Sequence, residues 1–290
     1  SLSPMAELKQ AGAIALTNCL NPIKDLLVLR RAMEYATGQD ITIFYQPQNN
    51  YLANNGCVHE GKISGKLGLP GIPSAAESVA VAEAILLSKL TNSRLHLCRV
   101  SCLESLMLIQ NAQSEGLPVT SDVALHQLFF DESSIDNFNS DFHVMPPFRS
   151  NEDLVALHQA VKKETITAIC SDHQPHNEDA KQAPFSDTQP GISSIELLLP
   201  LLMELVELKI IDMSVAIAKV TSNPSEILGI DAGVIAKGLP ADLCIIKKEA
   251  WLFDEAKILS SGKNNPFLGR KFNYLVDKTI CDGKIVYEKR

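Results

Sequence analysis

The sequence predicts an α/β fold: a parallel sheet wound with helices, followed by a small β-module. Three observations support this class. Short apolar runs alternate with helical patterns over the first 230 residues, several helical segments begin with polar start signals, and short strands with turns follow Asp231. Strands that alternate with helices pair in parallel. We therefore expect residues 1–230 to form one α/β unit and residues 231–290 a separate β-module.

Five apolar runs are expected to be the strands of the sheet. Each is short and rich in β-branched or other apolar residues, as buried parallel strands are. They cover residues 13–17, 41–45, 95–100, 119–123 and 166–171. Periodicity alone leaves two arrangements possible, an open five-stranded sheet and part of a barrel.

Helices are expected between these runs. Three Ser–Glu pairs have the spacing of a capping box, which marks a helix start: Ser74 with Glu77, Ser101 with Glu104, and Ser193 with Glu196. A further helix is expected to begin near Ser150. Apolar faces at helical spacing are formed by Leu26, Leu29, Met33 and Ala36, and by Leu154, Leu157, His158 and Val161.

The segment after Asp231 has a different pattern. Residues 233–235, 241–246 and 279–287 are short runs of strand-forming residues separated by turns. Asp282-Gly283 is a favourable hairpin turn, because both positions tolerate positive φ.

Composition excludes several functional classes. The chain is 46% hydrophobic and 21% charged, which is typical of soluble globular proteins. The net charge of −8 argues against a nucleic-acid partner. No apolar stretch approaches the ~20 residues of a membrane span. The seven cysteines are odd in number and form no CxxC pair, which predicts a reducing, cytoplasmic compartment without a disulfide framework.

The most informative motif is Ser-Asp-His-Gln-Pro-His, from Ser171 to His176, directly after the last apolar run. An aspartate at a strand's carboxyl end can ligate a metal and shuttle a proton. A histidine downstream can bind a substrate carboxylate. The alternative for this hexapeptide is a polar turn that caps a strand.

This motif resembles the last-strand motif of dihydroorotases. Other segments follow in that family's order: His59-Glu-Gly, the loop 67–73, Pro146-Pro-Phe-Arg149, Ala183-Pro-Phe and Asn264-Asn-Pro-Phe. The chain thus resembles the dihydroorotase group of the amidohydrolase superfamily, and its non-catalytic bacterial branch most. The resemblance implies a (β/α)8 TIM-type barrel with active-site residues at the carboxyl ends of the strands. The five runs then correspond to strands four to eight, and we expect the full-length gene product to contain the first three strands.

The resemblance also assigns positions to the family's zinc ligands, and most carry unsuitable residues. Strand four offers Asn18 or Cys19, strand five Gln46, strand six Arg99 and strand eight Asp172. A guanidinium has no lone pair to offer a metal. We therefore expect no zinc, a vestigial acid/base position at Asp172, and an ion pair between Arg99 and Asp172 in its place.

Three further residues follow from the same resemblance. His176 corresponds to a residue that binds the substrate carboxylate, and Met145 stands where the family commonly has a substrate-binding asparagine. His96 is expected to be a packed core histidine.

Two functions are implied. The first is a non-catalytic, dihydroorotase-like subunit of de novo pyrimidine (UMP) biosynthesis, which assembles with aspartate carbamoyltransferase in an oligomer. The second is an active zinc dihydroorotase, converting N-carbamoyl-L-aspartate to dihydroorotate and water. A related cyclic-amide hydrolase, such as allantoinase or hydantoinase, would need the same metals. Apolar residues at Phe129-Phe130 or Trp251-Leu252-Phe253 are candidates for partner contacts, or else belong to the core.

Overall fold

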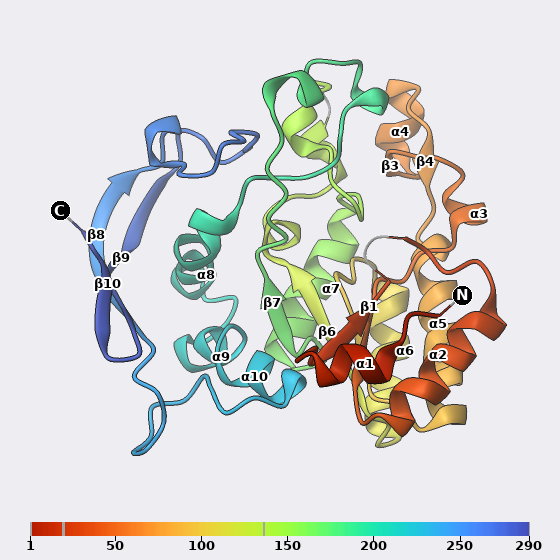
Figure 1. Ribbon diagram of the computed structural model, residues 1–290. Coiled ribbons are helices and arrows are strands. Elements are labelled where there is room, and N and C mark those ends of the chain that lie inside the picture. The colour runs from red at the N-terminus through yellow and green to blue at the C-terminus, as the bar shows by residue number, and fades with distance from the viewer. Residues whose placement is uncertain (1, 19–20, 136, 290) are drawn as a thin grey trace.

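A five-stranded parallel sheet forms the centre of the molecule (Figure 1). The computed structural model describes residues 2–18, 21–135 and 137–289. The strand order follows the chain: β1 (Ala15–Thr17), β2 (Thr42–Tyr45), β5 (Leu95–Leu97), β6 (Val119–Ala124) and β7 (Ala168–Cys170). All five predicted strands are confirmed at their predicted places, in the order of consecutive barrel strands.

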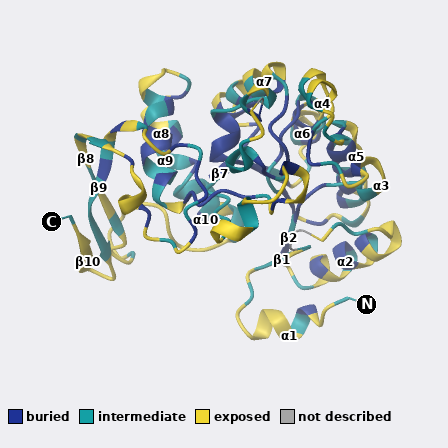
Figure 2. Ribbon diagram, turned by 90° about the horizontal axis from the view of Figure 1, so that it is seen from above, coloured by how far each residue is buried: buried dark blue, intermediate teal, exposed yellow. Residues whose placement is uncertain are grey.

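Helices after each strand cover one side of the sheet. They are α2 (Leu26–Gly38), α5 (Ala75–Thr91), α6 (Leu103–Ser114) and α7 (Asn151–Lys162), each packed on the next. A short helix, α1 (Met5–Gln10), precedes β1, while α8 (Leu198–Glu207), α9 (Met213–Ala218) and α10 (Ser222–Leu228) follow β7. The view from above shows buried residues gathered along the strands and the inner sides of these helices (Figure 2). The core therefore lies between sheet and helices, and includes Leu29, Met33, Val81, Leu95, Ile109 and Leu157.

The predicted helical faces are largely correct. Leu29, Met33 and Ala36 of α2 are buried, but Leu26 is exposed at the start of the helix. On α7, Leu157 and Val161 are buried.

The three predicted capping boxes are wrong, and Glu77, Ser101 and Glu196 have distant partners instead. Ser74 precedes α5 but makes no side-chain cap. Helix α6 is preceded by Cys102, and Ser101 instead donates its hydroxyl to Glu77. Glu196 lies in a short 3₁₀ helix (Ile195–Leu197) and accepts hydrogen bonds from the backbone of residues 259 and 260.

The helix predicted near Ser150 does have a capping box. The Ser150 hydroxyl accepts from the backbone N–H of Asp153, and the Asp153 carboxylate accepts from the Ser150 backbone N–H. Asp153 stands here at the position where a capping box usually has Glu or Gln.

A separate three-stranded antiparallel sheet contains β8 (Leu243–Leu252), β9 (Lys271–Cys281) and β10 (Lys284–Glu288), in the order β10-β9-β8. It lies beside α8, which contacts β9 (Figure 1). The predicted hairpin turn is confirmed: Asp282 and Gly283 both have positive φ, 48° and 74°. The strand predicted at residues 233–235 is wrong, because this segment forms bends without pairing.

A long connection between β2 and α5 stands above the carboxyl ends of the strands. It contains α3 (Asn50–Ala53), α4 (Lys62–Leu67) and the short parallel pair β3 (Val58–His59) and β4 (Gly71–Ile72). Within the described ranges, no helix has the length and apolar character to cross a membrane.

The proposed contact residues are mostly packed inside. Phe129 and Phe130 are partly buried in a cluster of aromatic rings with Phe142, Phe148 and Phe267. Phe253 is fully buried and the Trp251 indole donates to the Tyr274 carbonyl, whereas Leu252 is exposed. Four of these five aromatic and apolar side chains therefore belong with the core.

Candidate functional site

The carboxyl ends of four strands bring together the residues expected at the family's metal positions. Asn18 follows β1, Gln46 follows β2, Arg99 lies shortly after β5 and Asp172 shortly after β7. Because parallel strands end at one edge of a sheet, these residues face a common space. Cys19, the other candidate on the first of these strands, lies outside the described residues.

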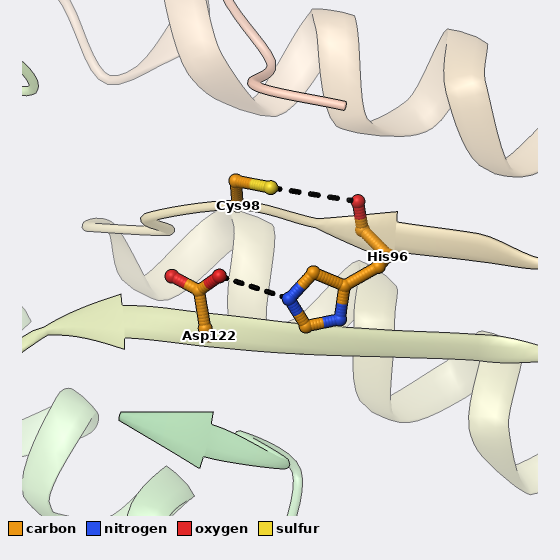
Figure 3. A group of neighbouring side chains, drawn as sticks. All are labelled: His96, Cys98 and Asp122. Atoms are coloured by element: carbon orange, nitrogen blue, oxygen red, sulfur yellow. Dashed lines mark hydrogen bonds and ion pairs between the residues drawn. The ribbon is translucent and has the colours of Figure 1, made fainter. Parts of the chain in front are cut away.

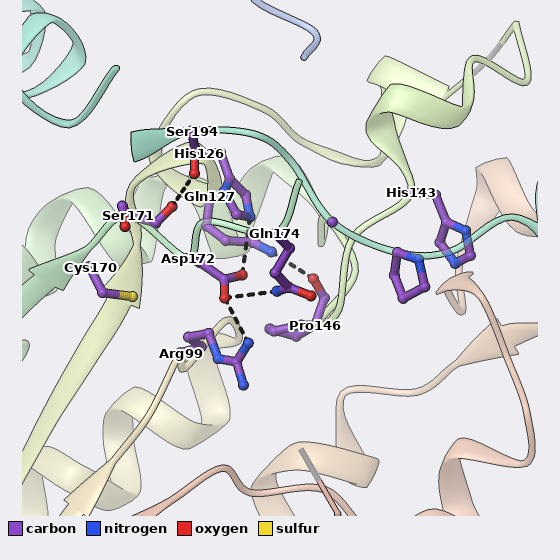
Figure 4. A network of polar contacts seen from close by, with 12 residues as sticks. Arg99, His126, Gln127, His143, Pro146, Cys170, Ser171, Asp172, Gln174 and Ser194 are labelled. Carbon is purple, nitrogen blue, oxygen red and sulfur yellow. Dashed lines mark hydrogen bonds and ion pairs between the residues drawn. The ribbon is translucent and has the colours of Figure 1, made fainter. Parts of the chain in front are cut away.

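Arg99 and Asp172 form a direct ion pair (Figure 4). The guanidinium Nη1 donates to Asp172 Oδ1 at 2.7 Å, and the two side chains are only 12% and 7% exposed. The second terminal nitrogen donates to the Gln46 side-chain oxygen. This confirms the ion pair expected from the sequence.

Gln46 is itself fixed by Asn18. The Asn18 side-chain oxygen accepts from the Gln46 backbone N–H at 2.9 Å, and its amide donates to the Gln46 carbonyl at 3.1 Å. Gln174 adds a donor to Asp172 Oδ1 at 2.9 Å. The four predicted positions thus form one continuous hydrogen-bonded group.

A buried carboxylate, Asp122 of β6, is hydrogen-bonded to this group. Its Oδ1 accepts from the Arg99 backbone N–H at 2.8 Å, and its Oδ2 contacts His96 Nε2 at 2.8 Å. Burial opposes ionisation, but the hydrogen bonds from His96 and Arg99 hold the pKa of Asp122 below its ordinary value. Arg99 has a φ of 54°, a conformation unfavourable for a bulky residue, and the Asp122 contact helps to hold it.

His96 is a core histidine, as expected. It is 1% exposed, and its other ring nitrogen contacts the Thr120 hydroxyl at 2.8 Å. The role of Asp122 was missed, although a carboxylate inside an apolar run is itself a signal of a buried polar partner.

His126 lies beside the ion pair and has no hydrogen-bond partner for either ring nitrogen among the described residues. Its Nε2 is 3.9 Å from Asp172 Oδ2. Burial lowers the pKa of His126 to about 4, so the ring is neutral near pH 7. A neutral imidazole cannot replace Arg99 as the counter-charge of Asp172.

Met145 fills the space where the resemblance places a substrate-binding residue. Its side chain packs against Ala53, Ile72 and Ala76. The pocket that it shares with Gln46 and Arg99 has a volume of about 10 Å³, and roughly 10–15 Å³ is needed for one water. This side of the site has no room for a small-molecule substrate, whereas Gln46, Arg99 and Asp172 also line a cavity of about 410 Å³.

His176 makes its hydrogen bonds outside the group around Arg99. Its Nε2 donates to the Pro190 carbonyl at 2.9 Å, and its backbone N–H donates to the Asn264 side chain at 2.8 Å. It lines a different cavity, with Lys181 and Asn264. The structure therefore does not join His176 to the group around Arg99.

A buried network that sequence reasoning missed holds the overlying loop. Arg149 is 3% exposed and donates to the Ser101 hydroxyl at 3.0 Å and to the Ile72 carbonyl at 2.9 Å. Its guanidinium is 3.7 Å from the Glu77 carboxylate, which also accepts from the Ser101 backbone at 2.9 Å. This network ties the loop 46–74 to the strand ends.

The residues at the metal positions do not fit zinc. A zinc site needs three or more protein ligands with free lone pairs. Arg99 offers none and directs its charge at the site, Gln46 offers only a neutral amide oxygen that already accepts from Arg99, and Asp172 is paired with Arg99.

Comparisons with known proteins identify the family. The model of the amidohydrolase family matches residues 29–286. The chain therefore belongs to the amidohydrolase family. Its curated relatives place it with the dihydroorotases and dihydroorotase-like proteins. A dihydroorotase-like protein of Pseudomonas aeruginosa is 40% identical over 287 residues, 99% of this chain and 68% of that protein. A dihydroorotase of Geotalea daltonii is 37% identical over 290 residues, 100% of this chain and 68% of that protein.

Solved structures show the same fold. L-hydantoinase (dihydropyrimidinase) from Arthrobacter aurescens has a TM-score of 0.88 at 21% identity, covering 98% of this chain and 67% of that one. A D-hydantoinase has a TM-score of 0.85 at 19% identity, covering 98% and 66%. The predicted TIM-type barrel is thereby confirmed, with five of its strands here. The chain spans about two thirds of the length of these relatives.

Proposed function

We propose that this protein is a dihydroorotase-like protein of pyrimidine biosynthesis that lacks ring-closing activity. We propose further that it serves as a structural subunit of a complex with aspartate carbamoyltransferase. The observation that carries the first part is the buried Arg99–Asp172 ion pair, in which a guanidinium is bound where the family has metal ligands.

The chemistry of ring closure explains why this pair matters. Joining the carbamoyl nitrogen of N-carbamoyl-L-aspartate to its carboxyl carbon, with loss of water, requires an activated carbonyl and a group that transfers protons. Asp172 is the residue for proton transfer, but one of its oxygens accepts from both Arg99 and Gln174. Met145 occupies the neighbouring space, and His176 is engaged by Pro190.

The setting of the protein supports a cytoplasmic role. The six cysteines of the described residues are all free, as in proteins of a reducing compartment. The role as a subunit rests on the preserved loops around an altered site: the network of Arg149, Glu77 and Ser101 keeps the loop 46–74 in place.

The alternative is an active zinc dihydroorotase. The retention of Asp172 and His176 and the 37% identity to a dihydroorotase favour it. A related cyclic-amide hydrolase such as allantoinase would meet the same obstacle at Arg99.

Assay of the purified full-length protein separates these functions. We expect no interconversion of N-carbamoyl-L-aspartate and dihydroorotate, with or without added Zn²⁺, and the same zinc content in the protein and its Asp172→Asn variant. Ring closure that chelators abolish and that Asp172→Asn removes would overturn the proposal.

A double substitution tests whether Arg99 and Gln46 are the cause. Gln46→His with Arg99→His places two imidazoles beside Asp172, and zinc affinity should rise at least about tenfold, because neutral imidazole is a good zinc ligand. Arg99→His alone should give a smaller gain. Equal zinc binding in the double variant and the unchanged protein would show that other features of the cavity prevent binding.

Co-expression tests the partner. This protein and aspartate carbamoyltransferase are expressed together and, for comparison, separately. When expressed together they should co-elute as an oligomer of defined mass, and carbamoyltransferase activity should be higher or more stable than in the transferase expressed alone. A transferase that is fully active and correctly assembled alone, and never co-elutes with this chain, would contradict the structural role.

A further inference from the structure

A second group of potential metal ligands lies on the sheet beside the family's metal position, to which Asp122 is joined by the Arg99 backbone N–H (Figure 3). His96 Nε2, Cys98 Sγ and a carboxylate oxygen of Asp122 are all within 4.8 Å of one another. His96 and Cys98 are two residues apart at β5, so both point to the same face as Asp122 of the neighbouring strand β6.

A second sulfur adjoins this group. Cys170 of β7 contacts Asp122 Oδ1 through its thiol at 3.3 Å. Cys98, Asp122 and Cys170 line a cavity of about 410 Å³, together with Gln46, Arg99 and Asp172. Three neighbouring strands thus present an imidazole, a carboxylate and two sulfurs.

We infer that His96, Cys98, Asp122 and Cys170 form a binding site for a thiophilic divalent cation of the zinc type. This ligand set combines the three donor types that zinc uses in proteins, and its sulfurs favour soft ions over Mg²⁺ or Ca²⁺. Ligand atoms around a tetrahedral zinc ion, with bonds of about 2.0–2.3 Å, lie roughly 3.3–3.8 Å apart. The ligand atoms of His96, Cys98 and Asp122 lie within 4.8 Å of one another, so they must move closer to reach that range.

Thr120 contacts the second ring nitrogen of His96. In the metal-free state, His96 Nε2 donates to Asp122 Oδ2 and Nδ1 contacts the Thr120 hydroxyl, each at 2.8 Å. When a metal binds, the ring proton moves to Nδ1, where the Thr120 oxygen accepts it, and the Nε2 lone pair is free to coordinate. Thr120 is therefore a positioning residue of the kind that orients metal-binding histidines.

Binding must release protons. Burial raises the pKa values of Cys98 and Cys170, so both thiols are protonated near pH 7. One divalent cation displaces two thiol protons to solvent, and the resulting site with two thiolates and the Asp122 carboxylate carries one net negative charge. Arg99 lines the same cavity, and its guanidinium is paired with Asp172. Affinity should therefore increase with pH.

Titration of the full-length protein with Co²⁺ tests the site. We expect a sulfur-to-cobalt charge-transfer band in the near ultraviolet, which Zn²⁺ or Cd²⁺ displaces. Cys98→Ser should abolish the band and Cys170→Ser should reduce its intensity by about half. Thr120→Val should weaken Co²⁺ binding by roughly 10–100-fold.

Two controls locate the ion. Cys57→Ser changes a buried cysteine of a different hydrophobic cluster, and Cys244→Ser changes an exposed cysteine of β8; both should keep the band and the affinity. No band in the unchanged protein, or a band that survives Cys98→Ser, would overturn the inference. If Cys98→Ser does not fold, Cys170→Ser decides the question, and a band of unchanged intensity in that variant would overturn the inference.

Discussion

At the scale of single residues, the candidate site shows how one guanidinium joins the ends of two strands. Arg99 has five donors, and it uses them to join Asp172 of one strand end to Gln46 of another. A buried ion pair adds little net stability, because both groups lose their hydration. Removing one partner is far more costly, because the other charge is then left unpaired.

This asymmetry predicts the effect of Arg99→Met. The variant should lose about 3–5 kcal/mol of unfolding free energy, because Asp172 is left as an unpaired buried carboxylate. The double variant Arg99→Met, Asp172→Leu should recover most of that loss. Urea unfolding monitored by circular dichroism measures both, and equal losses in the two variants would show that packing of Arg99, rather than its charge, is what matters.

Two buried histidines predict a loss of stability in acid. Burial lowers the pKa values of both His126 and His143 to about 4, below the ordinary value of roughly 6.5. Between these pH values the unfolded chain binds protons that the folded chain does not, so unfolding free energy falls as the pH is lowered from 6.5 to 4. Each group contributes up to about 3 kcal/mol. His126→Gln and His143→Gln should each flatten this part of the stability profile, and unchanged profiles would contradict the assignment.

At the scale of elements, strands were more predictable from the sequence than helix starts. The five strands are short apolar runs, and burial on both faces leaves little choice of residue. The capping pairs failed because Ser101 and Glu77, which lie far apart in the sequence, bond to each other and to Arg149. Nothing local in the sequence records such a contact. The positions of Asn18, Gln46, Arg99 and Asp172 were predictable from motifs. The hydrogen bond from His176 to the Pro190 carbonyl was not, because the two residues lie in different segments of the sequence.

The observed caps give a matched test. Ser150 accepts a hydrogen bond from the Asp153 backbone at the start of α7, whereas Ser74 makes no such bond at the start of α5. Ser150→Ala should therefore cost about 0.5–2 kcal/mol of unfolding free energy, and Ser74→Ala a small fraction of that. Chemical denaturation of the two variants side by side checks this, and a larger loss for Ser74→Ala would contradict the cap assignment.

At the scale of the whole molecule, the central sheet has two open edges. Within the described residues, β1 pairs only with β2 and β7 only with β6. A barrel of this type closes with eight strands, and unpaired edge strands promote association with other chains.

We therefore predict that residues 1–290 produced alone will self-associate or unfold without a sharp transition. Size-exclusion chromatography and a thermal melt measure this, with the full-length protein as the control. A monomer of residues 1–290 with one sharp cooperative melt would show that the five-stranded sheet is stable by itself.

The Arg99–Asp172 pair has a consequence for the conditions under which this fold can exist. The guanidinium of Arg99 is part of the polypeptide, so every copy of the chain carries one. A competing protein cannot remove it, as it could remove a bound metal ion. Strand ends that are joined in this way do not depend on nutrient supply. A cell starved of zinc would still produce these strand ends in their joined form, and any assembly built on them would keep its composition when metalloenzymes lose theirs.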